Sequence, residues 1–500
     1  MLRVFAGLLF LLLSPLAARA ALELDLAGGA VTETTRLTLS GEAAEPYLIL
    51  FAPYEEPTRL NAQVTLGIPI AFADLALSTP GCLGVLDGSG RAEVSFVLPN
   101  LPTILDLTLS FQAISRQPID EASNLLRLTP ALPESFEAAL GSPPVLIAGG
   151  GVLATAAGRL LFAGGSGPVV QSYDPDREEF ELAGVLPFGI ARGRTTPLHD
   201  GRLLFSGGLD SSGQPSDAAA LYDPATGQTL SLTMRHRRLG HGASLLTDGS
   251  VLITGGLETI VLTDLVQFLT GVQASTEFFD PVTESFSPGP NMLEARAFHS
   301  STALPGGKLL VAGGLSVIPI INLPAISNTA YVYNPSFNGF GLPILFPGAR
   351  IMHAATLLND GRVLLAGGLS IDFSDVIATG DLTQLRVDTL DDCLLFETTF
   401  FGGRFTAVPG LSSGRAGAGL AALPDGGALI AGGFRTSLGG GSLDFTPLES
   451  ADRFFATGAG TLAPTGAMSA ARIGPLLSPL SDGTVLVLGG GPAGAEIYQP

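Results

Sequence analysis

The sequence predicts an all-β protein whose main body is a seven-bladed β-propeller preceded by a small β-sandwich domain. Gly and Pro are abundant, with 65 and 36 residues among 500, and this composition favours short strands joined by tight turns. A short apolar run that begins at Gly and ends in Gly-Gly recurs seven times in the second part of the chain. Regular repetition of a strand-and-turn unit is typical of a closed ring of sheets.

Each copy of the repeat is expected to be a strand that follows a tight turn. Five copies are preceded by Asp, and Asp-Gly suits a hairpin turn because Gly tolerates a positive φ. Most Gly-Gly pairs are followed by an aromatic residue and a Pro-containing turn, as at Tyr222-Asp223-Pro224, which predicts a second hairpin. The copies are GRLLFAGG (158–165), GRLLFSGG (201–208), GSVLITGG (249–256), GKLLVAGG (307–314), GRVLLAGG (361–368), GGALIAGG (426–433) and GTVLVLGG (483–490).

The repeat resembles that of the kelch family, including forms in which an Arg and a His precede the turn. The resemblance covers residues 133–500 and implies a propeller with four strands in each blade. The chain ends after the third strand of its last unit, and Glu134-Ser135-Phe136-Glu137 looks like a fourth-strand segment. We therefore expect the strand at 134–137 to complete the seventh blade and to close the ring.

The N-terminal part of the chain differs from the repeats. Arg3, an apolar run and Ala18-Arg19-Ala20 form the three parts of a secretory signal peptide over residues 1–20. Residues 21–132 contain short alternating stretches and a hairpin signal at Asp87-Gly88-Ser89-Gly90, which favours a β-sandwich, with an immunoglobulin-like fold as the expected form. We expect a secreted, periplasmic or cell-surface protein without a membrane span after removal of the signal.

Charge and cysteine content exclude some classes of partner. The formal net charge is −20, and no Lys- or Arg-rich run offsets it, so nucleic-acid binding is not expected. The chain has two cysteines, Cys82 and Cys393, which make neither a disulfide framework nor a metal site. Whether they pair or stay as two buried thiols is left open by the sequence.

Arginine and histidine recur at fixed places in the repeat. His241, His299 and His353 each lie 14 residues before the first Gly of a Gly-Gly pair (241 to 255, for example), which favours a packing role over a metal site. Five arginines lie 17 residues before that Gly (238 to 255), and a sixth is out of step by two. Two roles are considered: a positive ring at one channel mouth that binds carboxylates or an acidic sugar, or pairing with acidic and carbonyl groups of a neighbouring blade. The six candidate ligand-binding residues are Arg192, Arg238, Arg296, Arg350, Arg415 and Arg472.

The kelch resemblance also includes copper-radical oxidases related to galactose oxidase. Those enzymes use two Tyr, two His and a Cys cross-linked to one Tyr, usually beside a Trp. This chain has no Trp, and Cys393 lies in the third-strand region of the fifth repeat without a Tyr-His pair in the C-terminal repeats. We therefore expect no copper, no other cofactor and no metal, and no catalytic residue is assigned.

Long insertions follow the Gly-Gly pair in four repeats, at 257–277, 315–330, 369–392 and 434–450. All four are expected on one face of the propeller, where insertions often form a binding surface. The expected function is an exported, non-enzymatic interaction protein that binds a protein or a glycan through this face. The alternative is a carbohydrate-active enzyme, such as a sugar epimerase or mutarotase or an oxidase-like protein.

Overall fold

The computed structural model divides the chain into two compact units, Met1–Pro133 and Glu134–Pro500. The structure describes residues 23–27, 34–40, 43–44, 46–52, 58–59, 65–66, 83–97, 109–115, 126–128, 135–139, 150–154, 159–164, 168–189, 191–260, 271–318, 323–374, 386–399, 402–439, 442–458, 460–491 and 494–500. The predicted signal peptide and Cys82 lie outside these residues. Within them, no helix has the length and apolar character that crossing a membrane requires.

The first unit contains two antiparallel sheets and a short strand pair. One sheet has the order β1-β2-β7, and the other has the order β6-β3-β8-β9. The buried side chains Leu37, Leu39, Ile49 and Phe111 come from both sheets, which contact each other through β1, β8 and β9. The strands are β1 (Glu23–Ala27), β2 (Thr34–Ser40), β3 (Pro46–Ala52), β4 (Thr58–Arg59), β5 (Thr65–Leu66), β6 (Leu83–Val85), β7 (Arg91–Val97), β8 (Leu109–Ser115) and β9 (Leu126–Leu128).

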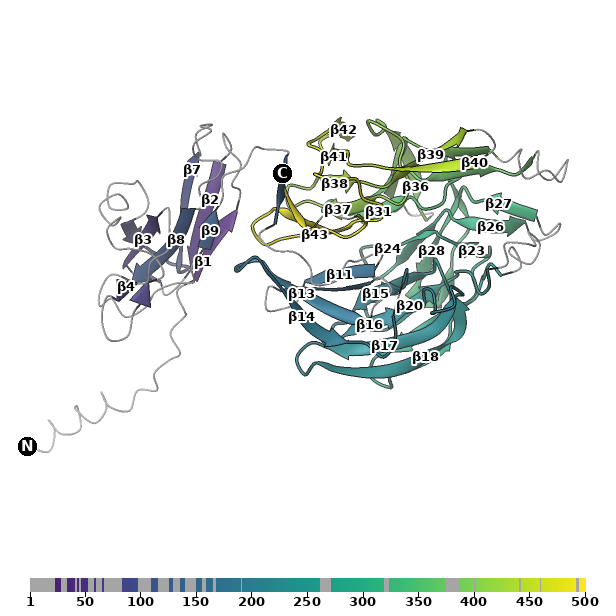
Figure 1. Cartoon of the computed structure of the whole chain (residues 1–500), viewed down its shortest axis with the longest axis horizontal. Helices are drawn as coiled ribbons and strands as arrows, with labels where there is room; N and C mark the ends of the chain where they lie inside the picture. The colour runs from purple at the N-terminus through teal and green to yellow at the C-terminus, as the bar shows by residue number, and fades with distance from the viewer. Residues whose placement is uncertain are drawn as a thin grey trace, which may run out of the picture. The chain divides into compact units, whose positions relative to one another are not determined.

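The second unit consists of small antiparallel sheets, most of them with four strands (Figure 1). We number seven of them in chain order. The first has β11 (Gly150–Ala154), β12 (Leu160–Gly164), β13 (Val169–Asp174) and β14 (Glu179–Val185). The second has β15 (Arg194–Pro197), β16 (Leu203–Ser206), β17 (Ser216–Asp223) and β18 (Gln228–Arg238). The third has β19 (Gly242–Leu245), β20 (Val251–Thr254), β21 (Thr276–Asp280) and β22 (Ser285–Pro288).

The remaining four sheets continue this pattern. The fourth has β24 (Ser300–Ala303), β25 (Leu309–Ala312), β28 (Thr329–Asn334) and β29 (Gly339–Phe340), with β30 (Ile344–Leu345) beside β28 and the short helix η3 (Pro335–Phe337) between strands. The fifth has β31 (Ala354–Leu357), β32 (Val363–Ala366), β35 (Cys393–Glu397) and β36 (Arg404–Val408). The sixth has β37 (Gly419–Ala422), β38 (Ala428–Ala431), β41 (Ala451–Phe455) and β42 (Thr461–Pro464). The seventh has the order β10-β45-β44-β43, with β10 (Ser135–Ala138), β43 (Leu476–Pro479), β44 (Val485–Leu488) and β45 (Glu496–Gln499).

The first strands of these sheets follow one another around a ring. β11 contacts β15, β15 contacts β19, and the series continues through β24, β31 and β37 to β43, which contacts β11. In the seventh sheet β10 pairs antiparallel with β45, with Phe136 opposite Tyr498. The two ends of the second unit therefore lie in the same sheet.

The repeated Gly-to-Gly-Gly segments form the second strand of each sheet, and their side chains are buried on both sides. Leu203 to Ser206 in the second sheet are all fully buried, because neighbouring sheets cover both of its faces. Apolar clusters join successive sheets, such as the one that contains Phe205 and Tyr222 together with Leu161 of the first sheet. The tight turns before these strands require Gly at a positive φ, as at Gly201 with φ of 85°.

Candidate functional site

Three extra hairpins stand on the face of the second unit where the Gly-Gly pairs lie. They are β26 (Leu315–Ile318) with β27 (Leu323–Ile326), β33 (Leu369–Asp372) with β34 (Arg386–Thr389), and β39 (Phe434–Gly439) with β40 (Ser442–Pro447). The short strand β23 (Arg296–Ala297) pairs with β26. β27 contacts β33, and β34 contacts β39, so the hairpins form one row over the fourth, fifth and sixth sheets (Figure 1).

An apolar cluster under the hairpins buries the hydrophobic residues of the insertions. Leu315, Leu369, Val387 and Phe434 come from the hairpins, and Leu257 comes from the insertion of the third sheet. Val317, Ile326 and Ile371 pack against this cluster. These apolar insertion residues therefore pack on one another, while Phe445 on β40 remains exposed with its ring against Phe434.

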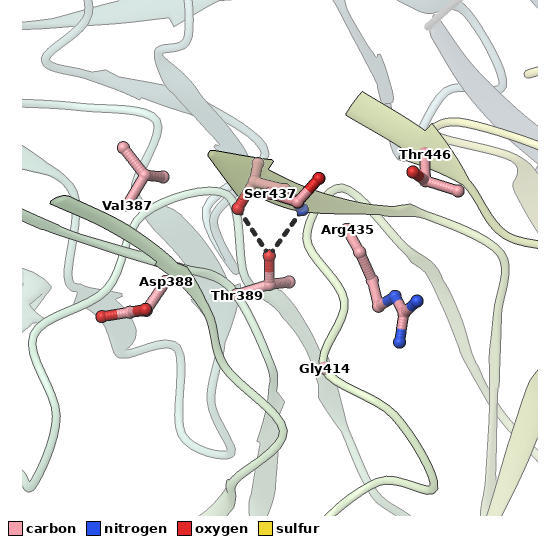
Figure 2. Close-up of a pocket in the computed structure, with 8 residues that line it drawn as sticks. Val387, Asp388, Thr389, Gly414, Arg435, Ser437 and Thr446 are labelled. Carbon is pink, nitrogen blue, oxygen red and sulfur yellow. Dashed lines mark hydrogen bonds between the residues drawn. The ribbon is translucent and has the colours of Figure 1, made fainter. Parts of the chain in front are cut away.

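A polar pocket of about 330 Å³ opens between the hairpins of the fifth and sixth sheets (Figure 2). On β34, Val387 belongs to the apolar cluster and, with Asp388 and Thr389, also lines the pocket. On β39, Phe434 belongs to the cluster and Arg435 lines the pocket. In Figure 2, Asp388 and Arg435 lie on opposite sides of Thr389. The lining residues are Val387, Asp388, Thr389, Gly414, Arg435, Thr436, Ser437 and Thr446.

Hydrogen bonds between the two hairpins fix the floor of the pocket. The Oγ1 atoms of Thr389 and Thr436 are 2.8 Å apart, and the Thr436 backbone N–H donates to Thr389 Oγ1 at 2.9 Å. A Cβ at Gly414 would lie 2.4 Å from the Thr389 carbonyl oxygen, so only Gly fits there without a shift of the backbone. The pocket therefore presents one carboxylate, one guanidinium and several hydroxyl groups on a braced frame. The sequence did not single out these residues, because the insertions have no repeat pattern.

Five of the six predicted arginines are fully buried, and each guanidinium binds the numbered sheet that follows it in the chain. Nη1 of each arginine donates to the carbonyl oxygen of the first Gly of its Gly-Gly pair, 17 residues further along the chain. The 17-residue spacing therefore reflects a repeated internal hydrogen bond. These bonds measure 2.5 Å for Arg238 to Gly255, 2.8 Å for Arg296 to Gly313, 3.1 Å for Arg350 to Gly367, 3.1 Å for Arg415 to Gly432 and 3.0 Å for Arg472 to Gly489.

A carboxylate neutralises each of the five buried arginines. Three carboxylates come from the third strand of the same sheet and two from loops beside it. The pairs are Arg238–Glu277 at 2.7 Å, Arg296–Glu294 at 2.6 Å, Arg350–Asp392 at 2.5 Å, Arg415–Asp452 at 2.7 Å and Arg472–Glu496 at 2.7 Å. Burial lowers the pKa of the Arg238 guanidinium, and Glu277 opposes this change.

The same arginines also join neighbouring sheets through their backbone. The N–H of Gly208 in the second sheet donates to the Arg238 carbonyl oxygen at 2.9 Å, and Gly256 in the third sheet donates in the same way to Arg296 on β23. The pattern continues at Gly314 to Arg350, Gly368 to Arg415 and Gly433 to Arg472. The Gly-Gly pairs and the arginine thus form one latch between two successive sheets, because the arginine backbone binds the earlier sheet and its side chain binds the later one.

These contacts correct the expectation of an open positive ring at a channel mouth. Arg238, Arg296, Arg350, Arg415 and Arg472 have 0% exposure, and their charges are already paired, so they are not available to a ligand. The carboxylate partners belong to the numbered sheet that follows the arginine or to the loops beside it, and the sheet before that one contributes the Gly N–H. Arg192 differs from the other five because it is exposed and has φ of 58°.

The three aligned histidines are buried and bind hydroxyl groups of the repeat. Nε2 of His241 lies 3.0 Å from Ser206 Oγ, and that of His299 lies 2.9 Å from Thr254 Oγ1. Nε2 of His353 lies 2.8 Å from Ser300 Oγ. Burial lowers the pKa of the His353 imidazole to about 3, which keeps it neutral. The structure gives these histidines the packing role that the repeat pattern favours.

These features define the class of the protein: it is a kelch-type β-propeller. No family model matches the sequence. Beta-scruin from Limulus polyphemus is 25% identical over 213 residues, which are 42% of this chain and 22% of that protein. Alpha-scruin from the same organism is 24% identical over 216 residues, or 43% of this chain and 23% of that protein. The chain therefore spans less than a quarter of the length of the curated relatives it matches.

Two solved structures are similar in fold. A fungal alcohol oxidase of the AA5 family, in complex with copper, has a TM-score of 0.53 and 16% identity, and the match covers 72% of this chain and 75% of that one. The protein YjhT has a TM-score of 0.47 and 17% identity, covering 65% of this chain and 99% of that one. At this identity, the likeness to the oxidase shows the fold alone.

The residues of this chain do not fit a copper site of the radical-oxidase kind. Over the described ranges, no group of three or more His, Cys, Asp or Glu side chains is arranged to hold a metal ion. Nε2 of each aligned histidine is already bound to a hydroxyl group. Cys393 is buried, and burial raises the pKa of its thiol to about 12. No step of the function is derived through a metal.

Proposed function

We propose that this protein is an exported, non-enzymatic binding protein that holds a glycan in the polar pocket between β34 and β39. The observation that carries this proposal is the lining of the pocket: Asp388, Arg435 and the hydroxyl groups of Thr389, Ser437 and Thr446. Sugars are recognised by hydrogen bonds: a carboxylate accepts them, a guanidinium donates them, and a hydroxyl group can do both. The volume of about 330 Å³ suits a small ligand.

The polar lining favours a glycan over a protein partner. A protein interface of ordinary size needs a broad patch with an apolar, desolvated centre. Leu315, Leu369 and Phe434 of the insertions pack in the cluster below the hairpins, while Phe445 on β40 is exposed. The residues that line the pocket are polar apart from Val387 and Gly414. This site therefore offers little apolar surface for a protein partner to bury, but it offers several hydrogen-bonding groups for a sugar.

We also propose the wider architecture in which this pocket works. The seven sheets form one seven-bladed propeller over residues 133–500, which β10 closes by pairing with β45. The segment 21–132 is a β-sandwich, which we take to be immunoglobulin-like, and residues 1–20 are a signal peptide that directs the protein to the periplasm, the cell surface or the medium. The net charge of −20 supports a partner other than nucleic acid.

The alternative of a carbohydrate-active enzyme would need a second acid or base beside Asp388. Hydrolysis of glycosides, for example, uses two carboxyl groups on either side of the scissile bond. The lining of the pocket includes one carboxylate. A binding role is therefore the better-supported function of this pocket.

The test is thermal unfolding of the protein against a panel of neutral and acidic oligosaccharides. A sugar that binds the folded state at about 100 times its Kd adds about 2.7 kcal/mol of stability. We expect one class of sugar to raise the transition of the wild type but not that of Asp388→Ala or Arg435→Ala. Arg404→Ala is the matched control, since Arg404 is exposed on β36 and paired with Glu397. If no sugar on the panel raises the unfolding temperature, the proposed function is wrong. If a sugar binds and is chemically converted, the enzyme alternative replaces the binding function.

A further inference from the structure

An unpaired cluster of arginines lies on the second sheet, away from the pocket. Its members are Arg192, Arg194, Arg235 and Arg237, which we call the arginine platform. All four are exposed, and no carboxylate of the described residues lies within ion-pair distance of their guanidinium groups. The chain has 45 acidic residues and 25 basic ones, so an arginine has many potential partners.

Five other arginines of the second unit have a carboxylate oxygen within 3.1 Å of the guanidinium group. Arg404 is the exposed member of this group, and the others are half-buried: Arg159, Arg202, Arg362 and Arg453. Two further exposed arginines, Arg177 and Arg435, form no ion pair with a described carboxylate, and they lie apart on the first sheet and on β39. The second sheet therefore differs in carrying four such arginines.

The backbone brings the two halves of the platform together. Gly208 N–H donates to the Arg238 carbonyl oxygen, and a Cβ at Gly208 would lie 2.5 Å from the Ala191 carbonyl oxygen. The segments that carry Arg192 and Arg237 therefore pass on either side of Gly208. Arg194 extends this link, since its Nε–H donates to the His241 carbonyl oxygen at 2.9 Å and its Nη atoms remain without a partner among the described residues.

The four residues are distributed along a line of strands, from the outer strand β18 to the first strand β15 of the second sheet and the segment just before it. On β18, Arg235 and Arg237 are exposed while Met234 and Arg238 are buried, so the two arginines share one face about 7 Å apart. Arg192 occupies the left-handed position of the repeat that is taken by Phe298 and Met352 in later sheets, and these two pack against the central apolar cluster. Arg194 on β15 and Arg192 just before it therefore form the inner end of the line.

The acidic groups near the platform form no ion pair with it. Asp210 Oδ1 accepts hydrogen bonds from the hydroxyl of Ser212 and from the backbone N–H groups of Gln214 and Ser212, which lower the pKa of this carboxyl, and the charge of Arg237 lowers it further. Glu258 accepts a hydrogen bond from Gln273 Nε2 at 2.7 Å and lies 3.9 Å from His236 Nδ1. No guanidinium group of the platform is bound to a described carboxylate.

We propose that the arginine platform binds an acidic polysaccharide that carries a carboxylate or sulfate on successive sugars. A line of guanidinium groups matches an extended polyanion, because each can fork-bind one anionic group. A globular acidic protein would meet the line at one or two points and would face the acidic remainder of the surface, where like charges repel. The second sheet also lacks a tall hairpin, since its strands β16 and β17 are joined through the tight turn at Asp210–Gln214, so a long chain has access.

The test is the binding of polygalacturonate and dextran sulfate to the full chain, with neutral dextran as the uncharged control. We expect the anionic polymers to bind at low salt, and an increase to about 0.3 M salt to weaken binding because it shortens the Debye length. The double variant Arg235→Gln/Arg237→Gln and the single Arg192→Gln should each weaken binding at least fivefold without a change in the unfolding temperature. Arg404→Gln is the matched control and should bind as the wild type does.

Three outcomes would overturn the proposal. They are equal binding of neutral dextran, unchanged binding by the double variant, or self-association of the protein that the double variant abolishes, which would assign the platform to a second copy of this chain. The pocket variant Arg435→Ala should leave polyanion binding intact. A failure of the platform is therefore distinguishable from a failure of the glycan pocket.

Discussion

The latch between Arg415 and Asp452 predicts a large loss of stability when one charge is removed. Arg415 is fully buried, Asp452 is 1% exposed, and Nη2 of the arginine lies 2.7 Å from Oδ2 of the carboxylate. The variant Arg415→Met would leave a buried carboxylate without its counter-charge, which costs about 3–5 kcal/mol. Such a loss is a large part of the 5–15 kcal/mol that stabilises a typical domain.

A double variant separates the charge effect from the loss of packing. In Arg415→Met/Asp452→Asn both charges are gone, and Asn keeps an oxygen that can accept the Ser412 N–H bond now made by Asp452 Oδ1 at 2.9 Å. We expect the double variant to recover at least half of the loss, because replacing a whole buried pair is often close to neutral.

Urea unfolding followed by tyrosine fluorescence measures both variants. The chain has no Trp, and five of its seven Tyr lie in the second unit: Tyr173, Tyr222, Tyr331, Tyr333 and Tyr498. The signal therefore reports mainly on the propeller. A single variant that loses less than about 1 kcal/mol, or a double variant no more stable than the single, would refute the reasoning.

Three further predictions concern the repeat and its buried groups. Gly255→Ala should destabilise far more than Gly213→Ala in urea unfolding, because both have a positive φ but only the first would place a Cβ 2.2 Å from the Arg296 carbonyl oxygen. The pKa of His353 is about 3 in the folded chain and about 6.5 in the unfolded chain, so the unfolded state binds more protons between these pH values. The free energy of unfolding should therefore fall by about 2 kcal/mol from pH 7 to 5, and His353→Gln should reduce this loss in urea unfolding. Since the Cys393 thiol has a pKa of about 12, a thiol reagent at pH 8 should label it, as read by peptide mass spectrometry, only when urea unfolds the protein.

The repeats predicted the all-β fold and its small sheets well, since each copy carries the same strand and turn residues. The spacing of Arg238 from Gly255 was visible in the sequence, but the hydrogen bond that explains it is not, because it depends on how two successive sheets pack together. The arginine was therefore considered both as a ligand and as a structural residue, and burial favours the second. A charged residue that recurs with the repeat most often serves the repeat.

The pocket and the arginine platform could not be read from the sequence. Thr389 and Thr436 lie in two different insertions, 47 residues apart, and their hydroxyl groups meet in the fold. The insertions share no repeated sequence pattern from which this contact could be predicted. Arg192 and Arg237 become neighbours only through the strand that runs between them. Arg192 was predicted together with the five aligned arginines, although it is two residues out of step with their spacing from Gly-Gly. Its side chain is exposed, unlike those of the other five.

The most direct test of the glycan pocket is hydrogen exchange of the protein with and without the sugar that stabilises it. The account predicts slower exchange in peptides that cover β34 and β39, centred on Thr389 and Thr436, because a ligand in the pocket would brace the two hairpins against each other. It also predicts unchanged exchange in β18, at the arginine platform, when the sugar is neutral. Protection that spares β34 and β39 and appears elsewhere would contradict the account.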